Sequence, residues 1–224
     1  MCKPSCVRAD RQDVSDALAK HKVSLRRLFL GVSASDGRVA GRKELAVLLN
    51  FDEWRLFFRE CKLVGPDLTE RDAKLVFTWA RMAVVGESSL LGQLKERGDI
   101  KEVNLPFEGF CECICRLAIL KSLPTDAEIK AAETSDAGMY IRHLCEADEA
   151  AYGALITSRG EPWPGAFHPR QSPGRCVDHM VMMIIRTVQG GAEGGPCGSG
   201  SAVCDEELSQ SDVDNFSKSF LAKL

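Results

Sequence analysis

Apolar side chains recur every three or four positions along most of this chain, and no stretch alternates regularly between apolar and polar residues. This spacing is typical of amphipathic helices, because 3.6 residues make one turn. In the first half of the chain the pattern predicts four helices, within residues 14–31, 51–64, 68–85 and 107–123. The joints between them carry glycine and proline, which end helices.

The second half of the chain predicts shorter helices and one long buried one. Thr125 and Glu128 form a capping box that starts a helix behind a proline. Residues 135–160 predict one or two short helices, and 161–175, with its prolines and glycines, predicts a loop. The strongly apolar stretch 176–189 predicts a buried helix. The last twenty residues place Val213, Phe216, Phe220 and Leu224 at helical spacing.

These patterns predict an all-α protein in five parts. The expected parts are a flexible N-terminal tail (1–13), a helical lobe (14–121), a helical extension (122–189), a glycine-rich linker (190–204) and an amphipathic C-terminal helix (205–224).

Composition and charge narrow the possible functions. The 224 residues carry a net charge of −3, which gives no electrostatic basis for nucleic-acid binding. The N-terminus lacks the apolar core of a secretion signal, and no apolar run is long enough for a membrane span. We therefore expect a soluble, cytoplasmic protein. Its ten cysteines are irregularly spaced, so we interpret them as small apolar packing residues.

One short pattern occurs twice. "LNFDEW" at 49–54 and "LPFEGF" at 105–110 share an apolar residue, Phe, an acid and a final aromatic, and each runs directly into a helical pattern. This arrangement resembles the loop ends and exit helices of a pair of EF-hands. The resemblance covers about residues 15–121 and implies two helix–loop–helix units that bury each other's apolar faces.

The resemblance assigns structural roles to the repeated positions. It implies a short β-bridge between Leu49 and Leu105 and core roles for the aromatic residues of the entering and exiting helices. The structural positions that it implies are Phe29, Leu49, Phe51, Trp54, Phe77, Leu105, Phe107 and Phe110. Trp79 is also expected on a core face.

The ligand positions depart from a working calcium loop, which spans 12 residues and ends on a bidentate Glu. In the first hand the resemblance implies Ser33, Ser35 and Glu53 as ligands, but the stretch from Ser33 to Glu53 is 21 residues long. In the second hand Arg81 stands at the first ligand position and Gly109 at the last, and the stretch from one to the other is 29 residues long. Because Ca²⁺ needs six to eight oxygen ligands, we expect a calcium-independent module and no required cofactor.

The expected function is that of a non-catalytic adaptor. Eroded EF-hand pairs of this kind bind proteins constitutively, so the resemblance implies a groove that binds an amphipathic helix of a partner without calcium control. The stretch from Asp52 to Met82 also resembles EF-hand proteins of algal and protist flagella, which implies a cytoskeletal or flagellar partner. Further candidate contacts are Trp163 in the proline-rich loop, and Val213, Phe216 and Phe220 in the C-terminal helix, which could dock in its own lobe or in a partner.

Other functions stay open as alternatives. The first hand alone could act as a calcium sensor. A cysteine- or histidine-dependent enzyme could be built around Cys145, His143 or His179, although no catalytic motif accompanies them. A zinc site at Cys197 and Cys204 is a weaker alternative. The final tripeptide, Ala222-Lys223-Leu224, resembles a peroxisomal address.

Overall fold

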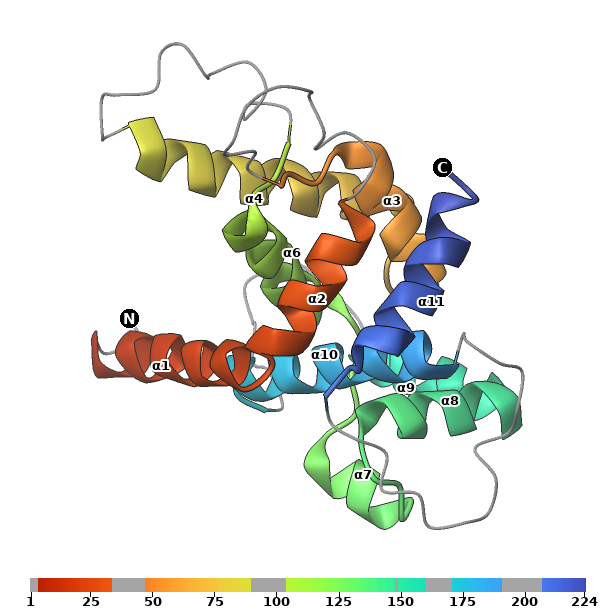
Figure 1. Ribbon diagram of the computed structural model, residues 1–224. Coiled ribbons are helices and arrows are strands. Elements are labelled where there is room, and N and C mark those ends of the chain that lie inside the picture. The colour runs from red at the N-terminus through yellow and green to blue at the C-terminus, as the bar shows by residue number, and fades with distance from the viewer. Residues whose placement is uncertain (1–3, 34–46, 90–103, 148, 160–170, 191–206) are drawn as a thin grey trace. The chain divides into compact units, whose positions relative to one another are not determined.

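The chain folds into two compact helical units. In the computed structural model, the described residues are 4–33, 47–89, 104–147, 149–159, 171–190 and 207–224, and their regular structure is entirely helical (Figure 1). One unit, the lobe, contains residues 23–113 and 208–224; the other contains residues 1–22 and 114–207 and is called the α10 unit after its longest helix, α10 (Pro173–Gly190). The predicted all-α class is confirmed, and the C-terminal helix belongs to the same unit as residues 23–113.

The lobe contains five helical segments. They are α2 (Lys22–Val32), α3 (Phe51–Glu60), α4 (Glu70–Ser89), the first half of α6 (Phe107–Leu120) and α11 (Gln210–Leu221). Their apolar stripes converge on a core of fully buried large side chains: Leu25, Leu28, Phe29, Leu49, Trp54, Phe57, Phe58, Leu63, Leu68, Leu105, Phe110 and Phe220.

Aromatic side chains pack reciprocally within this core. Phe29, on α2, meets Phe107 at the start of α6 with ring centroids 5.6 Å apart. Phe77, on α4, meets Phe51 at the start of α3 at 5.4 Å. Both pairs are edge-to-face, a favoured geometry for aromatic rings. Each helix–loop–helix segment thus inserts the aromatic of its first helix against the second helix of the other segment.

The N-terminal region differs from the sequence prediction. Helix α1 begins at Pro4, inside the segment predicted to be a flexible tail, and runs to Lys20. The single helix predicted over 14–31 is interrupted at His21, after which α2 begins. His21 is only 3% exposed and its Nε2 lies 2.6 Å from Asp178 Oδ1. The local periodicity could not reveal this long-range contact.

Helix α4 also differs from its prediction. It continues to Ser89, so Arg81 lies inside the helix and does not begin a loop. Trp79, predicted on a core face, is 41% exposed. Leu75 and Met82, on the same stripe of α4, are exposed as well. The helix buries its other face, through Ala73, Val76, Phe77 and Ala80. Apolar residues cover so much of the surface of α4 that its sequence allows either face to be buried. The packing of α4 in the lobe determines which face is.

The α10 unit is built around one long helix. Helix α10 (Pro173–Gly190) is the buried helix predicted from 176–189, and it packs against α1 and α8 (Ala137–Ala147). Helix α9 (Glu149–Arg159) packs on α8, and the short α7 (Asp126–Ala131) begins with the predicted Thr125–Glu128 capping box. In the described part of the chain, no helix combines the length and the apolar character that crossing a membrane requires.

Candidate functional site

Two short loop ends pair at the centre of the lobe. Leu49 and Leu105 form an isolated antiparallel bridge, in which each backbone N–H donates to the other's carbonyl oxygen at 2.8 Å. Both side chains are fully buried. This is the pairing that the EF-hand resemblance implies, and it holds the starts of α3 and α6 side by side.

The two helices that follow the loop ends begin with different N-terminal caps. This difference explains why the equivalent positions 53 and 109 hold different residues, Glu53 and Gly109. At α3, Asn50 and Glu53 form a capping box: the Asn50 N–H donates to Glu53 Oε2 and the Glu53 N–H donates to Asn50 Oδ1, each at 2.8 Å. At α6 the residue equivalent to Asn50 is Pro106, which has no N–H to donate. A carboxylate at position 109 would therefore lack its capping partner.

Packing excludes a side chain at Gly109 as well. A Cβ built at Gly109 would lie 2.6 Å from Leu105 Cδ2 and 3.4 Å from Leu105 Cβ. Because Leu105 is completely buried and holds the inter-loop bridge, it has little room to move. Gly109 thus lets α6 approach the bridging leucine.

The residues proposed as calcium ligands differ in their surroundings. Glu53 is fully buried and its carboxylate caps α3. Ser33 follows α2, is 1% exposed, and its buried hydroxyl has no hydrogen-bond partner among the described residues. Ser35 lies outside the described residues. Within the described ranges, no three His, Cys, Asp or Glu side chains are grouped as a metal site.

Helix α11 docks on one face of the lobe through apolar side chains. Two apolar anchors of α11, Val213 and Phe220, are 1% and 0% exposed, while Phe216 is half-buried and stacks on Phe220 at 6.1 Å. Burying such side chains stabilises docking by about 1.5–3 kcal/mol each. The predicted contact residue Trp163 lies outside the described residues. Leu224, also on the predicted stripe, is 52% exposed.

One stripe of α2 forms the centre of this face. Ser24, Arg27 and Gly31 are spaced three and four residues apart, so they lie on one side of the helix. The Leu208 N–H donates to Ser24 Oγ at 3.0 Å, and Arg27 Nη1 donates to the Leu208 carbonyl oxygen at 2.5 Å. These two hydrogen bonds fix the chain just before α11 begins.

Further along the same stripe, α11 and α2 approach closely at Gly31. A Cβ built there would lie 2.4 Å from Ser217 Oγ and 2.8 Å from Val213 Cγ1. At the far end, Lys223 Nζ lies 2.6 Å from Glu60 Oε2 at the end of α3. The order of these contacts shows that α11 runs parallel to α2, as Figure 1 also shows. We call this surface, formed by Ser24, Arg27, Gly31 and Glu60, the α11 face.

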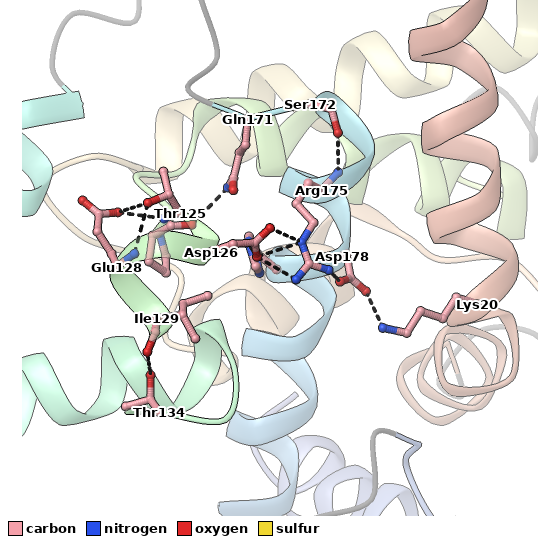
Figure 2. Close-up of polar contacts among 12 residues, drawn as sticks. Lys20, Thr125, Asp126, Glu128, Ile129, Thr134, Gln171, Ser172, Arg175 and Asp178 are labelled. Atoms are coloured by element: carbon pink, nitrogen blue, oxygen red, sulfur yellow. Dashed lines mark hydrogen bonds and ion pairs between the residues drawn. The ribbon is translucent and has the colours of Figure 1, made fainter. Parts of the chain in front are cut away.

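The α10 unit contains a separate polar cluster, drawn in Figure 2. Asp178 on α10 accepts a hydrogen bond from Lys20 Nζ at 3.0 Å and also contacts Arg175. The Arg175 guanidinium in turn binds Asp126 at the start of α7 (Figure 2). Burial of Asp178 opposes its ionisation, but hydrogen bonds from His21 and Lys20 outweigh it, so the pKa of Asp178 is lowered. The cluster ties α1, α7 and α10 together through charges that are paired.

The candidate catalytic residues do not share an exposed cleft. His179 is 2% exposed, and burial, followed by the nearby Arg175 charge, lowers its pKa. Its Nε2 lies 3.2 Å from Asp126 Oδ1 without hydrogen-bond geometry. His143 and Cys145 are exposed on α8. Because residues two apart on a helix point in different directions, these two do not face each other.

Cys61, which follows α3, and the cysteines of α6 behave as packing residues. Cys61 and Cys113 are buried, and Cys111 and Cys115 are half-buried. Burial, assisted by Glu60, raises the pKa of Cys61, and burial, assisted by Glu108, raises the pKa of Cys111 to about 12. Both therefore remain protonated thiols at neutral pH, and a thiol is a poor nucleophile and metal ligand. Cys197 and Cys204, the proposed zinc ligands, lie outside the described residues.

The sequence pattern identifies the α11 anchors but not the surface that receives them. The spacing of Ser24, Arg27 and Gly31 along α2 is visible in the sequence, yet small and polar residues at helical spacing are typical of a solvated face.

No protein-family model, curated protein or solved structure matches the chain.

Proposed function

We propose that the lobe is a non-catalytic, EF-hand-like protein-binding module that holds amphipathic helices and does so without calcium. The observation that carries this proposal is the docking of α11: the lobe binds an amphipathic helix through two buried apolar anchors and three polar contacts at its ends. Helix-in-groove recognition uses apolar anchors at this spacing.

Two features of the lobe support the EF-hand-like part of the proposal. The Leu49–Leu105 bridge joins two loop ends of similar sequence, and the Phe29–Phe107 and Phe51–Phe77 contacts are reciprocal. Both are arrangements that a pair of helix–loop–helix units would produce. Independence from calcium is supported by the capping role of Glu53 and by Gly109, which offers no side-chain oxygen.

Binding in trans tests the proposal. The substitutions Val213→Asp and Phe220→Asp, made together in the full chain, place two charges on the buried side of α11 and should release it from the lobe. A fluorescein-labelled peptide of residues 207–224 is then titrated into this vacated chain, with anisotropy as the readout. We expect saturable one-to-one binding that is at least ten times tighter than binding to the wild-type chain, where α11 competes.

A matched control adds the same charge to the exposed side of α11. Asn215 and Ser219 are both exposed, so Asn215→Asp with Ser219→Asp should leave α11 docked and peptide binding as weak as in the wild type. Circular dichroism reports whether each variant keeps its helices. A folded vacated chain that does not bind the peptide would refute the proposal.

The same titration, repeated with excess calcium and with a chelator, tests the calcium-independent part. We expect the dissociation constant to be the same in both conditions. Tight stoichiometric calcium binding by calorimetry, lost in Glu53→Gln, would instead favour the calcium-sensor alternative.

A further inference from the structure

We infer that the partner of the α11 face is an amphipathic helix that carries Ala or Gly at the position of Ser217, and that it binds by displacing α11. This inference rests on the proposed function and adds the chemistry of the partner. Three features of the contact between α11 and this face specify that chemistry: a close approach at its centre, a buried α11 hydroxyl without a partner among the described residues, and polar contacts at its ends.

The close approach at Gly31 limits the size of the opposing side chain. Without a Cβ, Gly31 lets α2 and α11 meet where Val213 and Ser217 face it, one turn apart on α11. A side chain larger than Ser at the second of these positions would meet the α2 backbone. The face therefore accepts a helix with a branched apolar residue followed, four positions later, by a small one.

The hydroxyl of Ser217 shows that α11 is an imperfect occupant. Its Oγ is buried in the docked helix and has no hydrogen-bond partner among the described residues. Docking therefore removes water from a hydroxyl that gains no hydrogen bond from the described part of the chain, which weakens the contact. Alanine at this position would keep the close packing, avoid that loss and favour the helix.

The ends of the face recognise different parts of an incoming helix. Ser24 and Arg27 bind the backbone N–H and carbonyl groups of Leu208, so any residue with a free N–H could stand there. Glu60 binds Lys223, so a cation is favoured after the last turn. Because Lys223 is half exposed, this ion pair selects among partners more than it adds affinity.

Covalent attachment gives α11 an advantage that a partner has to overcome. A tethered segment commonly has an effective concentration of about a millimolar. A partner helix that lacks the buried hydroxyl competes on better terms than a free copy of α11 does. The Ser217 hydroxyl, which has no hydrogen bond within the described ranges, thus makes α11 exchangeable, because it keeps the resident helix from binding as tightly as the α11 face allows.

Three labelled peptides test this inference on the full wild-type chain and on the vacated chain. They are residues 207–224 with the native sequence, with Ser217→Ala and with Ser217→Leu. We expect the Ala peptide to bind about tenfold more tightly than the native one, a factor equivalent to about 1.4 kcal/mol. We expect the Leu peptide to bind at least tenfold more weakly. Both ratios should be equal on the two chains, because α11 competes equally with every peptide.

A charge exchange tests the far end of the face. In the vacated chain, adding Glu60→Lys should weaken binding of the native peptide about two- to fivefold, and a Lys223→Glu peptide should recover that loss. Recovery would identify Glu60 as a selecting residue, whereas equal loss for both peptides would show that the substitution acts only through the fold.

The outcomes separate this inference from the proposed function. If the native peptide does not bind the vacated chain, the proposed function fails. If the native peptide binds but the three peptides have equal affinities, the module stands and the inferred partner chemistry is wrong. If light scattering shows that the wild-type chain exchanges α11 to form dimers, the occupant is a second copy of the chain, and the inferred partner is again wrong.

Discussion

Substituting Gly31 by alanine should release α11 from the lobe. The new Cβ would lie 2.4 Å from Ser217 Oγ and 2.8 Å from Val213 Cγ1, both well inside van der Waals contact. Ser217 can relieve its clash by rotating its hydroxyl. Val213 cannot, because a β-branched side chain on a helix has one strongly preferred rotamer and this one is buried. The helices must separate at this point.

The size of the effect follows from known costs of overpacking. An additional methyl group in a packed core costs about 1–3 kcal/mol, which lowers the docking equilibrium constant of α11 by a factor of about 5 to 150. Alanine also stabilises helix α2 by about 1 kcal/mol relative to glycine. That gain is the same whether α11 is docked or released, so it does not oppose the release.

Hydrogen exchange of the full chain measures this release. The backbone amides of α11 should exchange faster in Gly31→Ala by the factor above, while the amides of α3 keep their protection. Leu30→Ala is the matched control, because Leu30 is the neighbouring residue and is 46% exposed. Unchanged exchange of α11 in Gly31→Ala would refute the close approach as the specifying feature.

Three further predictions concern the stability of the two units. Gly109→Glu should destabilise the lobe by about 1–3 kcal/mol in urea unfolding, because its side chain meets the buried Leu105; equal midpoints for variant and wild type would contradict this. Asp136→Ala should destabilise the α10 unit by about 3–5 kcal/mol, because Arg186, only 5% exposed, would lose its carboxylate partner at 2.8 Å; Arg186→Met in the same chain should recover most of the loss. Because the pKa of His179 is lowered in the folded state, the unfolded chain binds a proton more readily than the folded one. The free energy of unfolding of the α10 unit should therefore be highest above about pH 6.5 and fall as the pH drops below that value. Urea unfolding at pH 7.5 and 5.5 measures this fall, which should be smaller in His179→Gln.

The repeated pattern in the sequence is enough to locate the centre of the lobe. The similar residues around Leu49 and Leu105 align these two positions, and the fold joins them by a bridge. The reason for Gly109 is only half visible in the sequence. Its lack of a ligand oxygen can be read directly, but its contact with Leu105 and the missing N–H of Pro106 acquire meaning only when the start of α6 is known.

Local signals account for most of the helices, because they act within one or two turns. The Thr125–Glu128 capping box and the buried stretch 176–189 depend on residues at most four positions apart, and the structure has a helix at both places. The interruption at His21 has no such signal, and the buried contact of this residue is with Asp178, 157 positions away. For the same reason the exposed side of Trp79 cannot be chosen from the pattern of α4 alone.

Residue spacing and short-range signals are thus sufficient to establish an all-α protein with two similar loop ends and an amphipathic C-terminal helix. They do not establish that this helix covers the lobe of its own chain, with Gly31 at the closest approach and the Ser217 hydroxyl without a hydrogen bond among the described residues. Amphipathic spacing shows that a helix has an apolar side to bury. What buries it depends on the shape of a surface assembled from distant residues, and no local pattern encodes that shape.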